Sequence, residues 1–431
     1  MIKKILKKII PLKFLRLYYQ AFPALGALLY RFPSRKLTVI GVTGTNGKST
    51  VVELITNILQ EAEFKVASIS SVRFQIKDQV WQNDLKMTMP GRLKIQRFFK
   101  KAVNADCKYV VLEVTSEGIK QFRHKFINFN TVVFTNLTKE HIEAHGSFEN
   151  YRKTKGKLFK NRGVKTVIVN TDDENAEYFL NFNIDKKWGY CIDRKEIKTK
   201  IVAKELETIK GKKLESLEDG IRMQIKGVKF NLKLLGEFNA YNTLAAVCTG
   251  LSEGISLEKI KQALEKIDGV SGRMELVVKE PFKVYVDYAH TPNALENVYK
   301  TLAGNRLICV LGSCGGGRDK WKRPEFGRIA ANYCSQIILT NEDPYGERPQ
   351  KILKDIEKGI LEYDTPSINH KLIFNRKGAI KEALALARVG DTVIITGKGS
   401  EPWMCVANGK KIPWDDRKIV REEIEKLNSK N

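Results

Sequence analysis

The sequence predicts an α/β protein with two successive domains, each built on an open sheet of mostly parallel strands. From residue 37 to about residue 180, short apolar runs rich in β-branched residues alternate with helical stretches, as in a doubly wound sheet. A second series of four such runs, between residues 283 and 396, ends each time in polar residues, as at the ligand-binding edge of another parallel sheet. A chain of 431 residues is long enough for both cores.

The first strand of the series leads into a glycine-rich turn, and the helix that follows opens with Lys48, Ser49 and Thr50. In such a turn the backbone N–H groups and the helix N-terminus face an anion, the lysine adds positive charge, and a hydroxyl reaches Mg²⁺. The general form of this motif requires a glycine where this chain has Val42. The alternative is a tight turn without a ligand.

The net charge of +26 comes from 75 basic and 49 acidic residues. Nucleic-acid binding is one explanation for such a charge. However, the basic residues are spread along the whole chain, and neither a zinc finger nor an aromatic RNA-binding pattern is present. We therefore expect anionic substrates or surfaces and no nucleic acid. The seven cysteines are scattered without a CxxC pair, which argues against a disulfide framework and favours the cytoplasm.

Residues 1–36 contain nine basic residues and no acidic residue. Residues 2–9 place their apolar side chains on one helical face and their lysines on the other. Residues 17–30 are apolar but interrupted, and they are shorter than the roughly 20 residues of a membrane span. Two interpretations stay open: an arm packed on the first domain, or a basic amphipathic element on the inner face of an anionic membrane.

Two later strands of the first domain end in residues suited to chemistry. The strand over residues 108–114 carries Glu113 near its C-terminal end, where open α/β sheets bind ligands and where Mg²⁺ finds oxygen ligands. A salt-bridged strand end is the alternative. After the strand over 131–136, His141 and His145 lie four residues apart, but with no third His or Cys nearby we predict no zinc site.

Residues 181–235 carry few signals, although the alternation over 221–235 predicts a small antiparallel excursion. A boundary into a second α/β unit is expected at residues 269–275. The four strands expected beyond that boundary span residues 283–287, 306–311, 336–340 and 392–396.

The segment TGTNGKST at residues 43–50 resembles the ATP loop of the Mur ligase superfamily, and matching blocks continue to about residue 420. The nearest branch is the MurE type, which adds the third stem-peptide residue to UDP-N-acetylmuramoyl-L-alanyl-D-glutamate. The resemblance implies a P-loop-type doubly wound ATP-binding domain over residues 37–270. It also implies a smaller Rossmann-like C-terminal domain over residues 271–431, with residues 1–36 as a basic amphipathic segment before both.

The resemblance also implies residue roles, with Lys48, Lys155 and His141 as the catalytic residues. ATP would be bound by Gly44, Thr45, Asn46, Gly47, Lys48, Ser49, Thr50, Asn239, Asn242, Arg273, Asp287 and Lys320. Two Mg²⁺ ions would be held by Ser49, Glu113, His141 and a carbamylated Lys155. The muramyl-peptide substrate would contact Thr88, Ser116, Gln121 and Arg123.

Three departures from the family pattern modify these expectations. The family normally begins with a domain that grips the UDP group, whereas 36 residues precede the ATP strand here, so the acceptor is expected to be held differently or to be lipid-linked. Tyr345 replaces an arginine of diaminopimelate-adding members, which favours lysine, ornithine or another amine. The distal ammonium of that amine would be received by Glu342, Asp343 and Glu401. Glu117 and Ser400 replace histidines common in the MurE branch.

The resemblance therefore predicts a monomeric, cytoplasmic, ATP-dependent amide ligase of peptidoglycan synthesis. A substrate carboxylate would attack the γ-phosphate of ATP, and an amine would then displace phosphate from the acyl phosphate. A folylpolyglutamate-type ligase is disfavoured by Ser49, and an amidating ligase subunit by the missing CxxC pairs. A non-catalytic scaffold is disfavoured because Lys48, Glu113 and Lys155 are all present together with His141.

Overall fold

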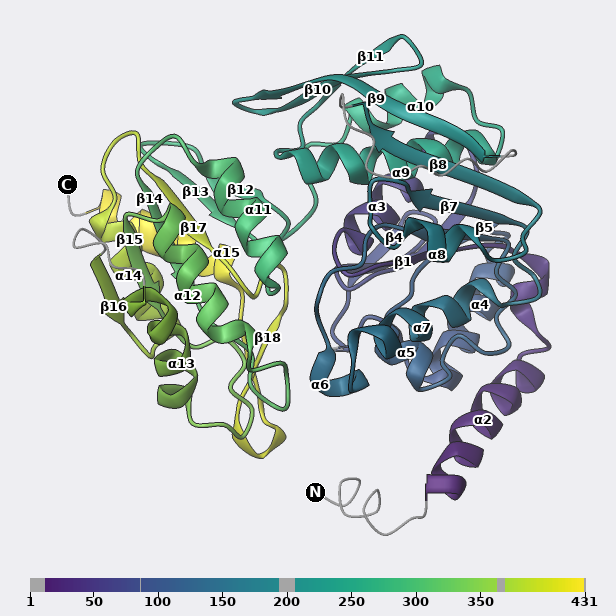
Figure 1. Cartoon of the computed structure of the whole chain (residues 1–431), viewed down its shortest axis with the longest axis horizontal. Helices are drawn as coiled ribbons and strands as arrows, with labels where there is room; N and C mark the ends of the chain where they lie inside the picture. Colours follow the sequence, from purple (N-terminus) through teal and green to yellow (C-terminus); the bar gives the residue numbers. More distant parts are fainter. Residues whose placement is uncertain (1–11, 86, 194–205, 363–368, 430–431) are drawn as a thin grey trace.

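The computed structural model describes residues 12–85, 87–193, 206–362 and 369–429. They form two lobes, each with its own central sheet, which lie side by side in Figure 1. The α/β class expected from the sequence is confirmed. The helix expected over residues 2–9 lies outside the described residues.

The larger lobe contains an eleven-stranded sheet in the order β11-β10-β9-β8-β7-β6-β1-β5-β2-β3-β4. The strands from β9 to β2 in this order pair in parallel, and antiparallel strands extend the sheet at both ends. The strands are β1 Thr38–Thr43, β2 Val66–Ile69, β3 Arg73–Ile76, β4 Gln79–Gln82, β5 Tyr109–Glu113, β6 Thr131–Phe134, β7 Thr166–Asn170, β8 Lys186–Ile192, β9 Leu206–Leu217, β10 Gly220–Ile225 and β11 Val228–Leu232.

Helices cover both faces of this sheet, because the strands are apolar on both sides. One face packs against α3 (Lys48–Glu61), α9 (Glu237–Ser252) and α10 (Leu257–Glu265), and Ile40 and Val42 of β1 point into that core. The other face packs against α4 (Arg92–Asn104), α5 (Ser116–Lys120), α7 (Phe148–Phe159) and α8 (Ala176–Leu180). Short α6 (Ile142–His145) precedes α7. The doubly wound arrangement brings the C-terminal ends of β1, β5 and β6 together.

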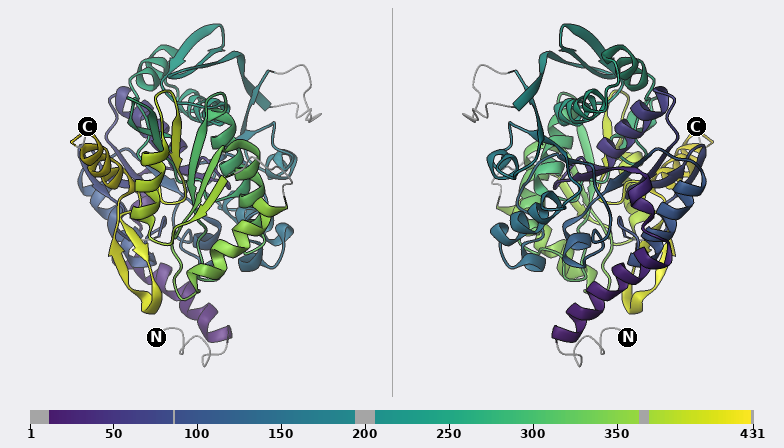
Figure 2. Two further views of the ribbon diagram at one scale, coloured as in Figure 1. Left: turned by 90° about the vertical axis from the view of Figure 1, so that its left-hand side faces the viewer. Right: turned by 90° about the vertical axis from the view of Figure 1, so that its right-hand side faces the viewer.

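The smaller lobe contains a six-stranded sheet in the order β12-β13-β17-β14-β15-β16, parallel except for the β12–β13 pair. The strands are β12 Glu275–Val278, β13 Lys283–Val286, β14 Leu307–Leu311, β15 Gln336–Leu339, β16 Asn369–Leu372 and β17 Thr392–Ile395. Helices α11 Pro292–Leu302, α12 Lys322–Tyr333 and α13 Pro349–Leu361 cover one face, and α14 Arg376–Leu386 and α15 Asp416–Asn428 cover the other. A hairpin of β18 (Trp403–Cys405) and β19 (Lys411–Pro413) follows β17, and the left view of Figure 2 faces this lobe.

Helix α2 (Leu12–Leu29) extends from the larger lobe and continues through Pro23, one of the residues that interrupt the apolar run over residues 17–30. Its C-terminal half packs on α4, where a Cβ on Gly26 would lie 3.1 Å from Leu93 Cδ2. The opposite side of α2 exposes three leucines, Leu25, Leu28 and Leu29. Helix α2 is therefore an arm packed on the core that also presents an apolar face to the outside.

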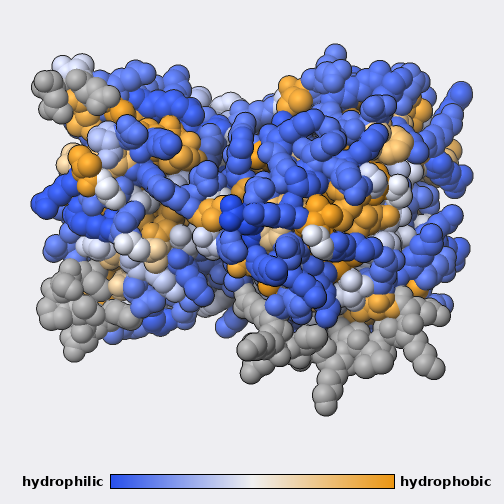
Figure 3. All heavy atoms as spheres, turned by 90° about the horizontal axis from the view of Figure 1, so that it is seen from above, coloured by the Kyte–Doolittle hydropathy of each residue, from blue (hydrophilic) through white to orange (hydrophobic). Residues whose placement is uncertain are grey.

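No helix among the described residues is long and apolar enough to cross a lipid bilayer. Seen from above, hydrophilic side chains cover most of both lobes, with smaller apolar patches between them (Figure 3). This surface agrees with the spread of charged residues along the sequence.

Candidate active site

The turn between β1 and α3 has the backbone geometry of an anion cradle. Gly44 and Gly47 have φ values of 152° and 82°, which side chains rarely tolerate. A Cβ on Gly47 would lie 2.2 Å from Asn242 Oδ1, and one on Gly44 would lie 1.9 Å from Thr135 Oγ1. Helix α3 begins after Gly47 without a side-chain cap, so its first N–H groups point into the turn.

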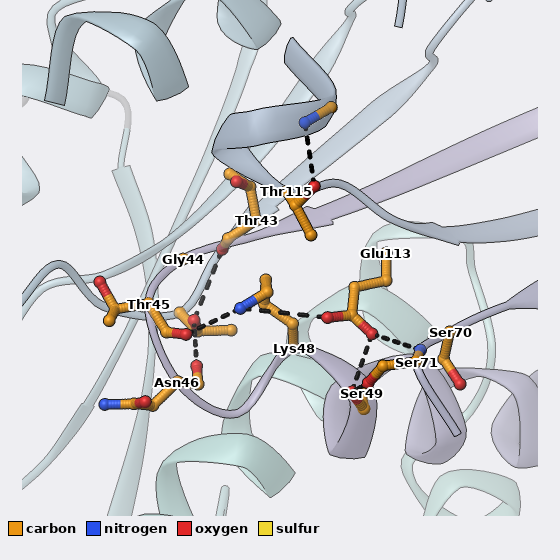
Figure 4. A network of polar contacts seen from close by, with 12 residues as sticks. Thr43, Gly44, Thr45, Asn46, Lys48, Ser49, Ser70, Ser71, Glu113 and Thr115 are labelled. Carbon is orange, nitrogen blue, oxygen red and sulfur yellow. Dashed lines mark hydrogen bonds and ion pairs between the residues drawn. The ribbon is translucent and has the colours of Figure 1, made fainter. Parts of the chain in front are cut away.

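Glu113, at the end of β5, faces the start of α3 (Figure 4). Its Oε2 accepts hydrogen bonds from Ser49 Oγ at 2.8 Å and from the Ser71 N–H at 2.9 Å. The Lys48 ammonium lies 4.0 Å from Glu113 Oε1 and donates to the Thr45 carbonyl at 2.7 Å. Burial lowers the pKa of Lys48, and the charge of Glu113 opposes that shift. The structure thus brings together a lysine, a hydroxyl and a carboxylate beside the cradle.

Lys155 reaches the same turn from α7, which covers the face of the sheet opposite to α3. Its side chain is 1% exposed, and Nζ donates to the Gly44 carbonyl at 2.6 Å. Burial, together with the nearby charge of Lys48, holds the pKa of Lys155 well below its ordinary value. A neutral lysine amine is the form that reacts with CO₂, so the environment of Lys155 suits carbamylation.

His141 lies on the loop that joins β6 to α6 and adopts a left-handed conformation with a φ of 58°. Its ring lies 5.8 Å from the ring of Tyr151, whose hydroxyl is 3.1 Å from Thr45 Oγ1. Burial lowers the pKa of His141 well below its ordinary value, which keeps the imidazole neutral and able to bind a metal. The sequence did not single out Tyr151, which links this loop to the cradle.

The two predicted asparagines lie in the first turns of α9. Asn239 Oδ1 accepts a hydrogen bond from Asn242 Nδ2 at 2.8 Å, and Asn239 itself donates to the Leu235 carbonyl. Asn242 lines the cavity beside Gly47, whereas Asn239 lies behind it. Asn239 therefore orients Asn242.

The smaller lobe contributes Arg273 to the cradle. Its Nη2 lies 3.2 Å from Ser71 Oγ and 3.4 Å from Ser49 Oγ, and its guanidinium lies 4.4 Å from the ring centre of Tyr288. Asp287 accepts hydrogen bonds from the backbone N–H groups of Met274 and Ala289, and burial raises its pKa. Asp287 thus fixes the backbone next to Arg273.

Lys320 does not lie where the sequence predicted it. Its side chain is exposed outside the cavity, and only its backbone N–H bonds across the lobes, to Glu143 Oε1 at 2.8 Å. The cations that line the cavity from this segment are Arg318 and Lys322. Lys322, the first residue of α12, is buried and lines the cavity, whereas Lys320 before the helix is exposed.

The four residues predicted to contact a muramyl peptide line the same cavity, on the side of the larger lobe: Thr88, Ser116, Gln121 and Arg123. Arg123 donates to Gln121 Oε1 at 2.7 Å and to the Met89 carbonyl. Ser116 Oγ lies 3.2 Å from His145 Nε2. These contacts hold the polar groups in fixed positions near the N-terminus of α5.

Glu342, Asp343 and Glu401 also line the cavity, but two of them already have a cation. The Lys398 ammonium, which is fully buried, donates to Asp343 Oδ1 at 3.0 Å and to Glu401 Oε2 at 2.6 Å. Asp343 and Glu401 therefore already face a cation of the protein, and their contact with a substrate ammonium stays a prediction. Glu342 is different: its Oε2 is buried without a hydrogen-bond partner, and burial raises its pKa.

A single cavity of about 1200 Å³ contains most of these groups, between the two lobes. The donor set suits ATP and Mg²⁺. Side chains at Gly44 or Gly47 would block the phosphate cradle, so the glycines leave it open for a ligand. On the cavity wall, the buried atoms Glu140 Oε2 and Thr138 Oγ1 have no hydrogen-bond partner. Among the described residues no three His, Cys, Asp or Glu side chains gather as metal ligands. Mg²⁺ keeps several waters and phosphate oxygens as ligands, so one carboxylate, one hydroxyl and one imidazole suffice for it.

Comparison with known families identifies two domains in the chain. Residues 42–250 match the Mur ligase middle domain, and residues 272–399 match the glutamate ligase domain of Mur ligases.

Curated relatives match nearly the whole chain. A UDP-N-acetylmuramoyl-L-alanyl-D-glutamate–2,6-diaminopimelate ligase of Clostridium acetobutylicum is 36% identical over 95% of this chain and 82% of its own length. The corresponding ligase of Clostridium tetani is 38% identical over 92% of this chain and 80% of its own length. A solved structure of a ligase of the same name superposes with a TM-score of 0.60 and 28% identity, over 91% of this chain and 79% of that one. The chain therefore belongs to the Mur ligase family of ATP-dependent carbon–nitrogen ligases.

Proposed function

We propose that this ligase adds the third amino acid of a stem peptide to UDP-N-acetylmuramoyl-L-alanyl-D-glutamate. One observation carries the proposal: the phosphate cradle, the predicted muramyl-peptide residues and the strand ends of the smaller lobe all line one cavity. The named activity of the relatives supports the same reaction. We take residues 37–270 as the ATP-binding domain and residues 271–431 as the domain that closes over it.

In this reaction a carboxylate oxygen of the acceptor peptide attacks the γ-phosphorus of ATP, and ADP leaves. The amine nitrogen then attacks the acyl carbon, phosphate leaves, and the amine loses a proton. Lys48 and Arg273 stabilise phosphate charge beside the cradle. Mg²⁺ held by Ser49, Glu113 and His141 would neutralise the phosphate oxygens, and a carbamylated Lys155 would add a carboxylate for a second ion.

The amino acid is proposed to be lysine, ornithine or a similar diamine. Arg318 lines the cavity and would bind the α-carboxylate that every amino acid carries. Glu342 offers the unpartnered buried oxygen for a distal ammonium. Arg318, Glu342 and the Cys314 thiol all line this cavity. Tyr345 supplies no cation for the second carboxylate of meso-diaminopimelate.

Phosphate release from ATP tests the reaction. The purified protein would receive UDP-N-acetylmuramoyl-L-alanyl-D-glutamate together with lysine, ornithine or meso-diaminopimelate, and each compound alone as a control. We expect release only when the nucleotide peptide and one diamine are both present. Efficient use of meso-diaminopimelate would overturn the amine assignment, and release only with a lipid-linked acceptor would overturn the nucleotide-linked one.

We also propose that the enzyme works as a monomer and rests on an anionic membrane through residues 1–36. Leu25, Leu28 and Leu29 of α2 are 54%, 64% and 65% exposed, and the segment carries nine basic residues. Co-sedimentation with phosphatidylglycerol vesicles, but not with phosphatidylcholine vesicles, is expected. Replacing the three leucines by serine should abolish it, whereas Leu361→Ser on the far lobe should not. Equal binding to both vesicle types, or none, would refute the proposal.

A further inference from the structure

The loop that carries His141 makes several contacts with the other lobe. Its neighbours along the chain, residues 139–143, contact residues 319–322, which connect β14 to α12 in the smaller lobe. We call the first stretch the histidine loop and the second the clasp segment.

Asp319 makes the central contact of the clasp segment. Its two carboxylate oxygens accept hydrogen bonds from the N–H groups of Glu143 at 2.8 Å and of Ile142 at 3.1 Å. Asp319 is 2% exposed, so these bonds are shielded from water. A carboxylate at the first turn of a helix satisfies N–H groups that have no partner within the helix. Asp319 thus caps α6 from the opposite lobe.

Three more contacts hold the same loop on either side of His141. Glu143 Oε1 accepts from the Lys320 N–H at 2.8 Å, and the Lys139 ammonium lies 4.3 Å from the ring centre of Trp321. The Lys322 ammonium lies 3.0 Å from Glu140 Oε1, with both side chains at most 3% exposed. The residues before and after His141 are therefore tied to the smaller lobe, while His141 itself faces the cavity.

His141 has a left-handed backbone with a φ of 58°, a conformation that a non-glycine residue keeps only where its surroundings support it. We propose that Asp319 is a positioning residue: by capping α6 across the two lobes, it fixes His141 for Mg²⁺-ATP only when the lobes are closed. This inference rests on the proposed use of His141 as a metal ligand. If Asp319 acts in this way, Mg²⁺ binding and closure of the two lobes are coupled.

The test uses the full chain with Asp319→Asn, which keeps the shape of the side chain but places an amide N–H against the two helix N–H groups. Calorimetry would measure the affinity for a non-hydrolysable ATP analogue with and without Mg²⁺. We expect the affinity without Mg²⁺ to stay within about twofold, and the gain in affinity that Mg²⁺ produces to fall about tenfold, as for lost supports of metal ligands. The Mg²⁺ concentration for half-maximal ligase activity should rise by a similar factor.

Two further variants separate positioning from general damage. Asp355→Asn removes a carboxylate that bonds Arg323 within the smaller lobe and should leave the Mg²⁺ effect unchanged. Glu143→Ala removes the side chain that accepts the hydrogen bond from the Lys320 N–H of the clasp segment. This variant should also reduce the gain in nucleotide affinity that Mg²⁺ produces, as Asp319→Asn does. Small-angle scattering should show that the analogue with Mg²⁺ contracts the wild type more than Asp319→Asn.

The outcomes are distinguishable. Equal loss of affinity with and without Mg²⁺, or an unchanged Mg²⁺ effect in Asp319→Asn, would overturn the positioning role. Because nucleotide binding is measured apart from turnover, a wild type that binds Mg²⁺-ATP but ligates none of the tested amines would refute the proposed reaction while leaving this inference open to the same binding test.

Discussion

Lys155 and Lys398 are both buried, but their partners differ. Lys155 donates to a backbone carbonyl and lies near another lysine, whereas Lys398 lies between two carboxylates. Removing each should therefore have a different consequence. We propose that the first lysine serves the reaction and that the second stabilises the smaller lobe.

Lys155→Ala should abolish turnover while leaving the fold intact. The variant loses the amine that would be carbamylated, together with one hydrogen bond to the Gly44 carbonyl. Ligase activity and the thermal unfolding midpoint would be measured against Lys157→Ala, which alters an exposed lysine of the same helix. Turnover near the wild-type rate in Lys155→Ala would exclude a catalytic role.

Lys398→Met should destabilise the protein by about 3–5 kcal/mol, because it removes the buried cation that lies against buried Asp343 and partly exposed Glu401. Urea unfolding would measure the change. Lys371→Met, which removes the partner of Glu382 in an exposed ion pair, should change the free energy of unfolding by less than about 1 kcal/mol. Similar effects of the two variants would show that Lys398 does not compensate buried charge.

His124 should make the protein sensitive to mild acid. Burial lowers its pKa in the folded state to about 4, against an ordinary value of 6.5, so the unfolded chain binds the extra proton first. Stability contributed by neutral His124 is then lost as the pH falls from about 6.5 towards 4, by about 2 kcal/mol between pH 7 and pH 5. Urea unfolding at both pH values should show a smaller loss in His124→Gln than in the wild type.

Among single elements, the turn between β1 and α3 combines unusual backbone torsions with close packing. Gly47→Ala should lose nucleotide affinity, because the added Cβ meets Asn242 and the φ of 82° is unfavourable for alanine. Gly227→Ala is a matched control, since its φ is 83° and its Cβ would meet nothing within 4 Å. Both should lose about 1–2 kcal/mol of stability, but only Gly47→Ala should lose ATP-analogue binding in calorimetry. Retained binding would show that the turn can adjust.

The sequence predicted the buried parallel strands well, because strands covered on both faces need continuous apolar runs. The predicted ranges 108–114, 283–287 and 392–396 correspond to β5, β13 and β17 within one or two residues. Strands β4 and β9 escaped prediction. All four residues of β4, at one edge of the sheet, are exposed, and β9 carries five lysines and glutamates among its twelve residues, so neither has an apolar signature.

The candidate site was only partly predictable for a related reason. Lys48 can be predicted from its spacing in the glycine-rich turn, and Glu113 can be predicted from its place at the end of a buried strand. Lys322, Lys398 and Asp319 each act through at least one partner more than 50 residues away. Such pairings are set by how the lobes and loops meet, which spacing along one chain does not reveal.

At the scale of the whole molecule, Arg273 bridges the lobes at the phosphate cradle. Arg273→Ala should raise the KM for ATP and lower kcat, with a combined loss of about 10- to 100-fold if two charge-assisted hydrogen bonds disappear. Steady-state kinetics would measure both constants, and the free energy of unfolding should change little because the side chain lies at the interface. Arg421→Ala, on the outer side of the same lobe, provides the control. Unchanged kinetics in Arg273→Ala would place ATP elsewhere.

The cavity is divided between two lobes, and this division affects how the specificity for the added amino acid can change in evolution. The cradle that activates the acceptor belongs to the larger lobe, whereas Arg318 and Glu342, proposed to choose the amine, belong to the smaller one. A chimera that exchanges the smaller lobe between relatives would then change which amino acid is added without rebuilding the chemistry of ATP. Provided that residues 319–322 still match the histidine loop, new stem peptides are accessible by recombination of whole domains as well as by point substitution.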